Sequence, residues 1–327
     1  MQIELLELLR CPQTGETLEL QSPEYVNGRV RAGWLVATGS GRRYPIRDFI
    51  PRFVPDSNYA DNFGMQWNLF RQTQLDSHSG QSISRDRFWK ATGWDPQAMA
   101  GRWVLDCGCG AGRFAEIALG AGAKVIALDY SSAVDACYAN LKDHPGLHVV
   151  QGDIYALPFA KGFFPFVYSL GVLQHTPDVA KAFAALPPMV VSGGSLCVDF
   201  YQRSWKTWLW PKYWLRPITR RMAQPRLFEL LQRWVPTLLS ISMVVQRIPW
   251  VGSLAKHFVP VANYHGIHPL SPTQLQEWAL LDTFDMFAPQ YDNPQTPAVV
   301  QQLLDAAGLR DTRVLKAGHL VGRGRKA

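Results

Sequence analysis

The chain has 327 residues and a formal net charge of +7, with 47% hydrophobic and 18% charged residues. This composition is typical of a globular protein, and the absence of any run of about 18 apolar residues argues against a membrane-spanning helix. The five cysteines are odd in number and scattered, and two glutamates interrupt the first apolar stretch, so we expect no signal peptide and a cytoplasmic protein with reduced thiols.

Four regions follow one another along the chain. Residues 1–55 read as a small module, with a short helix over Ile3–Leu9 and then short strands broken by Gly and Pro. Residues 56–100 form a polar connecting arm. From 101 to 201 apolar strands alternate with helical stretches, and this alternation resumes at 294–327 after an interruption at 202–293. Such alternation predicts an α/β fold with a mainly parallel sheet and helices on both faces.

Within the α/β region the predicted elements come in a regular order. Thr296 and Pro297 are expected to cap and start a late helix that stops at Gly308. The strands are predicted at 103–107, 123–129, 147–153, 164–170, 195–201, 311–317 and 319–326. The remaining helices are predicted at 113–119, 133–141 and 178–190.

The stretch VLDCGCGAGRF (104–114) lies at the first strand-to-helix junction, where α/β sheets bind ligands. Its glycines are spaced G-x-G-x-G, and Arg113 stands where a dinucleotide fingerprint needs another glycine. Asp106 would repel a pyrophosphate but could pair with a cationic amino group. These residues therefore predict a positively charged nucleoside ligand. With no other Cys or His nearby in sequence, Cys107 and Cys109 do not predict a metal site.

Two more acids end the next two strands. Asp129 lies where an acidic residue accepts hydrogen bonds from ribose hydroxyls, and Asp153 precedes the apolar Ile154, a pair suited to adenine. Each Asp alone reads as readily as a helix N-cap. Three acids at three successive strand ends, the first beside the glycine loop, favour a nucleoside site.

These segments resemble class I S-adenosylmethionine-dependent methyltransferases. The resemblance is carried by VLDCGCGAG, IALDYS, QGDIYALPF, SLGVLQHTPD and MVVSGGSLCVDF, and it covers about 101–201 and 294–327. It implies a Rossmann-like seven-stranded sheet whose last strand, 319–326, inserts antiparallel. It also implies S-adenosyl-L-methionine as the cofactor.

The resemblance assigns cofactor-binding residues. It places Asp106 at the methionine amino group, Asp129 at the ribose, and Asp153 with Ile154 at the adenine. The full set of cofactor-binding residues that we predict is Asp106, Gly108, Cys109, Gly110, Gly112, Asp129, Tyr130, Ser131, Asp153, Ile154 and Leu170.

The predicted catalytic residue is His175, because the loop after the fourth strand faces the transferred methyl group in this family. A general base would remove the proton of a hydroxyl acceptor; the alternative is that His175 only packs. His265, His268, Asp282 and Asp285 are weaker candidates. Tyr291 and the arm residues Phe63, Gln66 and Trp67 are predicted to contact the substrate, although the arm could instead simply dock on the core.

The N-terminal module resembles the zinc-ribbon-like domain that activates methyltransferases or precedes them in one chain. The match lies in LLELLRCPQTGETLEL and RRYPIRDFIPRF. The zinc ligands are missing, because Thr14 stands where the family has a second Cys, and no further Cys or His occurs before His78. We expect a metal-free module that packs on the core or helps to recognise the substrate.

The insertion at 202–293 is basic and rich in tryptophan. Residues 203–262 contain ten Lys or Arg, one acid (Glu229) and six of the twelve tryptophans. Leu227, Leu230, Leu231, Trp234, Leu238 and Ile241 fall at helical spacing, with Pro236 as a predicted kink. The pattern predicts a helical lid over the acceptor pocket, and residues 203–262 also suit peripheral contact with an anionic membrane. Nucleic-acid binding ranks third.

Taken together, the sequence predicts methyl transfer to a small-molecule or lipid-linked acceptor, with oxygen favoured. An RNA base methyltransferase with a degenerate zinc module is the alternative enzyme. The alternative that is not an enzyme is a regulatory protein that binds the cofactor without catalysis. The predicted location is cytoplasmic, with a peripheral position at the inner face of the membrane as a variant of it.

Overall fold

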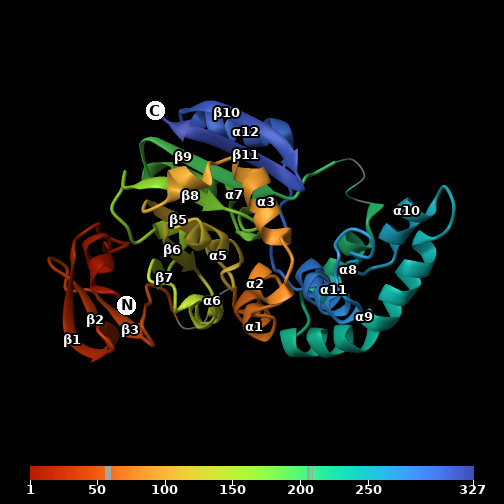
Figure 1. The fold of residues 1–327 in the computed structure, drawn as a ribbon, viewed down its shortest axis with the longest axis horizontal. Helices are drawn as coiled ribbons and strands as arrows, with labels where there is room; N and C mark the ends of the chain where they lie inside the picture. Colours follow the sequence, from red (N-terminus) through yellow and green to blue (C-terminus); the bar gives the residue numbers. More distant parts are fainter. Residues whose placement is uncertain (56–59, 205–206, 208) are drawn as a thin grey trace.

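A seven-stranded mixed sheet occupies the centre of the structure, a computed structural model that describes residues 1–55, 60–204, 207 and 209–327 (Figure 1). The spatial order is β10–β11–β9–β8–β5–β6–β7. The strands are β5 (Trp103–Cys107), β6 (Lys124–Asp129), β7 (Leu147–Gln151), β8 (Phe164–Ser169), β9 (Val190–Phe200), β10 (Leu309–Ala317) and β11 (His319–Lys326).

The pairing confirms the predicted α/β fold. Strands β5 to β9 pair in parallel, whereas β11 runs antiparallel between β9 and β10. The tight turn at Gly318, with a φ of 79°, joins β10 to β11. The ends of β5, β6 and β7 are therefore neighbours at one edge of the sheet, as the placement of the three acids requires.

Two helical layers cover the sheet. Alternate strand residues point to opposite faces, so Val104 belongs to the core cluster of one layer and Leu105 to that of the other. The first layer contains α3 (Ile83–Thr92), α5 (Arg113–Gly120) and α6 (Ala133–Leu141); the second contains α7 (Val179–Ala184) and α12 (Pro297–Ala306). By the same alternation Asp106 faces the α3–α5–α6 layer.

The predicted helix at 178–190 is too long. Helix α7 ends at Ala184, a 3-10 turn spans Pro187–Met189, and β9 already begins at Val190. Two consecutive prolines lack the N–H groups that a continuing helix needs, so the chain turns and enters the strand five residues before the predicted start. Likewise, the predicted helix over Ile3–Leu9 is a 3-10 helix that ends at Glu7.

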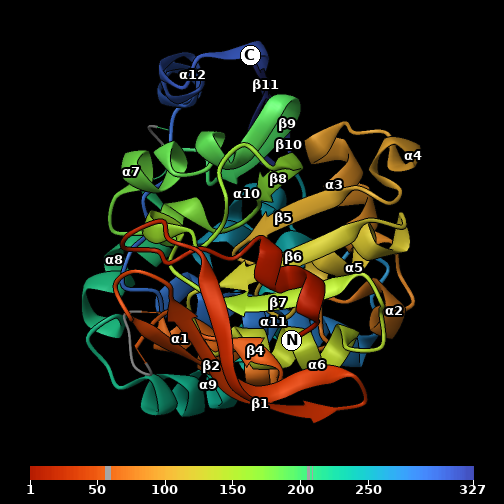
Figure 2. The same ribbon diagram turned by 90° about the vertical axis from the view of Figure 1, so that its left-hand side faces the viewer.

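The first 55 residues form a separate antiparallel sheet. Its strands are β1 (Leu18–Val26), β2 (Arg29–Ala37), β3 (Arg43–Arg47) and β4 (Ile50–Pro51). Figure 2, seen from the side of this sheet, places it in front of the β7 edge. There the Phe53 N–H donates to the Gln151 carbonyl (2.8 Å), and Arg52 pairs with Asp135 (2.6 Å). Cys11 is buried, with its Sγ 3.2 Å from the Tyr44 hydroxyl oxygen.

The connecting arm is helical rather than irregular. It contains α1 (Asp61–Leu69), α2 (Asp76–Ser79), α3 and α4 (Pro96–Met99). Helix α1 packs on the start of α6 so closely that a Cβ on Gly64 would lie 2.3 Å from the Ser132 hydroxyl. A side chain at position 64 would therefore push α1 off the core.

The insertion is helical, as predicted. It contains α8 (Pro211–Thr219), α9 (Gln224–Gln246), α10 (Gly252–Ala255) and α11 (Pro272–Phe287) and forms its own core cluster. Trp205, Lys206 and Trp208 lie outside the described residues. In the part of the chain that the structure describes, no helix combines the length and apolar character needed to cross a bilayer.

The predicted apolar stripe of α9 is only partly buried. Leu227 and Leu231 lie in the insertion core together with Val235 and Leu239, whereas Leu230, Trp234 and Ile241 are about half exposed. The apolar spacing in the sequence does not separate the two faces of α9, because both faces carry apolar residues at intervals of three and four. Helix α9 continues through Pro236 to Gln246.

Candidate functional site

The side chains of Val172 and Trp67 pack closely against the glycine loop after β5. A Cβ on Gly108, whose φ is 92°, would lie 2.3 Å from the Val172 side chain, and one on Gly110 would lie 3.1 Å from the Trp67 ring. A Cβ on Gly112 would instead meet Leu141 of α6 at 2.6 Å. Gly108 and Gly110 therefore let other groups approach the loop, whereas Gly112 serves the packing of α5 against α6.

Asp129 ties the end of β6 to this loop. Its Oδ2 accepts a hydrogen bond from the Gly110 N–H (3.0 Å), and its Oδ1 accepts from both the N–H and the hydroxyl of Ser131. Burial raises the pKa of Asp129, and these hydrogen bonds oppose that rise. Each carboxylate oxygen can accept two hydrogen bonds, so Oδ1 is fully used and Oδ2 retains capacity for one ligand hydroxyl.

Asp106 is buried below the glycine loop. Its Oδ2 has no hydrogen-bond partner within the described chain, and burial raises the pKa of Asp106 to about 8. The nearby Tyr168 hydroxyl opposes this shift, but no hydrogen bond of normal geometry joins the two groups. An unpaired buried carboxyl of this kind is costly unless a ligand compensates it.

Asp153 is the N-cap of a short helix, the role that the sequence allows for each of the three acids on its own. Its Oδ1 accepts from the Tyr155 N–H (2.9 Å) at the start of a 3-10 helix over Ile154–Ala156. Ile154 is buried and lines the cavity described below, whereas Asp153 does not.

A cavity of about 1140 Å³ lies between this edge of the sheet and the insertion. Five predicted site residues do not line it: Asp106, Gly112, Ser131, Asp153 and Tyr291. The predicted residues that do line it are Phe63, Gln66, Trp67, Gly108, Cys109, Gly110, Asp129, Tyr130, Ile154, Leu170 and His175. The arm both docks on the core and contributes to the wall, and the Gln66 Oε1 is a second buried polar atom without a partner in the described chain.

His175 lies in the cavity wall with a defined proton position. Its Nδ1 is 3.1 Å from the backbone carbonyl oxygen of Tyr291. A carbonyl only accepts, so Nδ1 carries the proton and Nε2 is the acceptor of the neutral ring. The Phe63 and Tyr201 rings pack on either side, with centroids 5.3 and 5.4 Å away. Tyr291 thus contributes its carbonyl.

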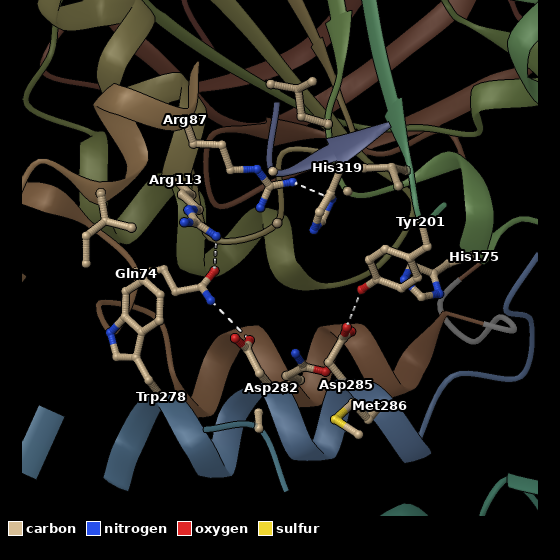
Figure 3. A pocket seen from close by; sticks show the side chains of 18 of the residues that line it. Gln74, Arg87, Arg113, His175, Tyr201, Trp278, Asp282, Asp285, Met286 and His319 are labelled. Carbon is tan, nitrogen blue, oxygen red and sulfur yellow. Dashed lines mark hydrogen bonds between the residues drawn. The ribbon is translucent and has the colours of Figure 1, made fainter. Parts of the chain in front are cut away.

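Arg87 and His319 line another part of the wall (Figure 3), and Arg87 belongs to a buried ion pair. Arg87 of α3 lies 2.7 Å from the Asp199 carboxylate of β9, and the Gly171 N–H donates to the other carboxylate oxygen. Burial alone would raise the pKa of Asp199, but Arg87 and His319 hold it well below its usual range. Arg87 also lies 3.1 Å from the His319 Nδ1. The same Nδ1 lies 3.4 Å from the Asp199 carboxylate, so it accepts from Arg87 in the neutral ring and donates to Asp199 in the charged ring; Nε2 carries a proton in both of these states.

A chain of polar contacts joins the core to α11. Figure 3 shows Arg113 donating to Gln74 (2.8 Å) and Gln74 donating to Asp282 (3.1 Å). Burial raises the pKa of Asp282 to about 6, although a hydrogen bond from Tyr264 opposes the shift. Farther along α11, Asp285 accepts a hydrogen bond from the Tyr201 hydroxyl (2.9 Å). Hydrogen bonds to Asp282 and Asp285 therefore hold α11, a helix of the insertion, over the cavity.

The weaker histidine candidates occupy different positions. His268 lines the cavity and packs between the Tyr264 and Trp278 rings, whereas His265 is exposed and lies outside it. Sequence reasoning did not find Arg87, Arg113 or His319, nor Asp199 and Tyr201. The one signal available was Asp199, a charged residue inside the apolar strand SLCVDF, which implies a buried partner.

Part of the chain is similar to known methyltransferases. Residues 105–198 match the family model described as a methyltransferase domain. The demethylmenaquinone methyltransferase of Thermobifida fusca is 35% identical over 121 residues, which cover 36% of this chain and 51% of that protein. A ubiquinone biosynthesis O-methyltransferase of Aromatoleum aromaticum is 32% identical over 115 residues, covering 34% and 49%. The chain thus spans about half the length of these relatives.

Among solved structures, human N-acetylserotonin methyltransferase in complex with SAM aligns with a TM-score of 0.43 and 14% identity, covering 83% of this chain and 57% of that one. The segment 105–198, which matches the methyltransferase-domain model, contains the glycine loop, Asp129 and His175.

Proposed function

We propose that the chain transfers the methyl group of S-adenosyl-L-methionine to an oxygen of a small-molecule or lipid-linked acceptor. The observation that carries this proposal is the presence in one cavity wall of the glycine loop, Asp129 and the acceptor nitrogen of His175. The matched relatives are named for quinone biosynthesis, and one of them is named as an O-methyltransferase. A quinol-type hydroxyl is therefore the acceptor class that we favour.

The residues present fit the cofactor. The unpartnered Oδ2 of Asp106 and Oε1 of Gln66 suit its ammonium group, and Asp129 Oδ2 has acceptor capacity for one ribose hydroxyl. Ile154 and Leu170 offer apolar surface, with the second oxygen of Asp153 assigned to the adenine amino group. Tyr130 and Cys109 complete the wall, while Ser131 and Gly112 hold it in place. When bound, the cofactor supplies a methyl group activated by the sulfonium charge.

The chain's own residues then act on the acceptor. His175 Nε2 takes the hydroxyl proton, and the Tyr291 carbonyl holds the ring by its Nδ1–H. His319 presents a donor nitrogen that can orient a second oxygen of the acceptor. Helix α11 lines one side of the cavity through Trp278, Asp282, Asp285 and Met286.

The alternative of an RNA base as acceptor has less support. In the described part of the chain, none of residues 1–55 lines the cavity, and the module sits at the β7 edge. The resemblance of this module to the zinc-ribbon-like domain stays an expectation. The described residues contain no group of three His, Cys, Asp or Glu placed to hold a metal. A purely regulatory cofactor-binding protein would bind the cofactor without turnover.

The cofactor assignment is tested by titrating S-adenosyl-L-methionine against wild type and Asp129→Ala. A hydrogen bond to a charged group contributes about 1.5–3 kcal/mol, so the loss of one weakens binding by about 10- to 10²-fold. Asp143→Ala, at an exposed position outside the cavity, is the matched control and should bind as wild type does. Equal affinity of wild type and Asp129→Ala would contradict the proposal.

The number of protons released when the cofactor binds tests whether Asp106 lies beside the ammonium group. With a pKa of about 8, this carboxyl is mostly protonated at pH 7. An ammonium group beside it lowers that pKa, so binding releases a proton and affinity rises with pH until the free carboxyl is ionised, above about pH 9. Calorimetry at pH 7 in buffers of different ionisation enthalpy measures the proton. Asp106→Asn must lose this contribution, and identical proton release in both proteins would show that Asp106 does not face the ammonium.

A further inference from the structure

Helix α9 carries a second apolar stripe on its outer face. Leu230, Trp234, Ile241 and Val244 follow one another at intervals of three, four or seven residues, Ile248 continues the series just past the helix end, and all five are 46–65% exposed. Residues at these intervals share one side of a helix. The opposite stripe, from Leu227 to Leu239, is the one that packs on α11. One side of α9 is thus apolar without contact to the core.

The stripe continues into the turn after the helix. Trp250 is fully exposed, at 101% of its reference area, and Val251 and Leu254 are each 56% exposed. Figure 1 shows this turn, between α9 and α10, at the end of the molecule farthest from the N-terminal sheet. An indole at a projecting tip, followed by aliphatic side chains, is the composition of an anchor for the interface between water and lipid.

The charges beside the stripe are almost all positive. Arg226, Arg233 and Arg247 are exposed on α9, whereas Glu229 is its only acid. Arg220 and Arg221 are exposed just before the helix. This combination complements an anionic bilayer, which attracts the arginines and accepts the apolar side chains between them. It is unlike a groove for RNA, where bases stack on single aromatic platforms among basic residues.

The same end of the insertion borders the cavity. Lys256 and His257, just after α10, line the cavity wall, and so does Ile267, which is 57% exposed. Phe258 is 49% exposed and packs against Trp210, another lining residue (5.9 Å between centroids). Exposed apolar side chains therefore occur both at the tip of α9 and at the rim of the cavity.

We propose that α9 and the turn at Trp250 dock on an anionic lipid bilayer, with the stripe Leu230–Ile248 in the headgroup region and Trp250 at its inner boundary. Docking in this way turns the rim at Phe258 and Ile267 toward the lipid. A lipid-linked acceptor then enters the cavity without passing through water; this last step rests on the proposed function.

Co-sedimentation of the full chain with vesicles tests the docking. Wild type should bind vesicles of phosphatidylcholine with phosphatidylglycerol, bind those of phosphatidylcholine alone far less, and be released as salt rises. The triple variant Trp234→Ser, Ile241→Ser, Trp250→Ser should lose about tenfold or more of its binding. Arg226→Gln, Arg233→Gln, Arg247→Gln should lose the preference for the anionic lipid.

Matched controls separate docking from general stickiness and from folding. Tyr25→Ser, Trp34→Ser, Val299→Ser removes three exposed apolar side chains far from α9 and should bind as wild type does. Binding of S-adenosyl-L-methionine by every variant reports on folding and on the cofactor site, so a failure of docking is distinct from a failure of the proposed function.

Three outcomes would overturn the proposal. The first is wild-type sedimentation that does not depend on anionic lipid. The second is a dimer by light scattering that the α9 triple variant converts to monomer without any vesicle binding, which would make the stripe an interface between copies. The third is a gel shift of wild type with RNA, at matched salt, that the arginine variant abolishes, when wild type binds no anionic vesicles.

Discussion

Replacing His175 by glutamine is expected to lower kcat by about 10²–10⁴-fold, the contribution of a positioned general base. Affinity for S-adenosyl-L-methionine should not change, because the variant leaves the glycine loop and Asp129 intact. Glutamine can keep the hydrogen bond to the Tyr291 carbonyl but cannot take a proton from the acceptor. Single-turnover rates with a quinol-type acceptor measure the effect.

The pH dependence distinguishes a base from a packing residue. Without His175 the reaction depends on hydroxide or on prior ionisation of the acceptor, so the rate of His175→Gln should keep rising with pH where wild type has levelled off. His268→Gln, a change of the same kind within the same cavity, is the control and should retain the wild-type profile. A His175→Gln enzyme with the wild-type profile and a small loss of rate would assign His175 to packing.

The second large effect concerns stability. Asp199→Asn is expected to lower the free energy of unfolding by about 3–5 kcal/mol, the cost of removing one partner of a buried ion pair. Asp199 is fully buried, and its loss leaves the Arg87 guanidinium with no carboxylate within 4 Å in the described chain. Urea unfolding of wild type and variant measures the difference, with Asp143→Asn as the exposed control.

A double variant and a pH series make this second prediction specific. Arg87→Gln combined with Asp199→Asn should be more stable than the sum of the single losses predicts, because neither charge is then left alone. The native pKa of Asp199 lies below its unfolded value of about 3.9, so its contribution is complete above that pH and is lost as the pH falls further. The stability gap between wild type and Asp199→Asn should therefore be constant from neutral pH to about pH 5. A gap that closes within this range would show that Asp199 is not held as a carboxylate.

The sheet and the nucleotide side of the site could be predicted because their signals are local. The strand at 103–107, the glycine loop and Asp129 lie within 27 residues, and the two strands that flank the loop have mainly apolar interiors. The helix predicted at 178–190 was too long, and here too the sequence held a local signal, the pair of prolines at Pro187 that stops a helix. Short-range pattern and stereochemistry are enough for such features.

The acceptor side could not be predicted in the same way. Arg87 and His319 meet although 232 positions separate them, and no periodicity links a residue on an arm helix to one at a hairpin turn. The exposed apolar stripe of α9 could not be predicted for another reason. A helix with apolar residues on two faces has the same spacing as a helix with one broad buried face, and only the packing of α11 shows which stripe is inside.

The insertion of β11 between β9 and β10 has a consequence for the order in which the protein acquires its site. All other strands of the sheet precede β11 in the chain, yet β11 is an interior strand and brings His319 to Arg87. During synthesis, β5 to β9 and the cofactor loop can pair first, whereas the acceptor wall waits until β11 has emerged and entered the sheet. A nascent chain thus becomes competent for cofactor before it becomes competent for acceptor.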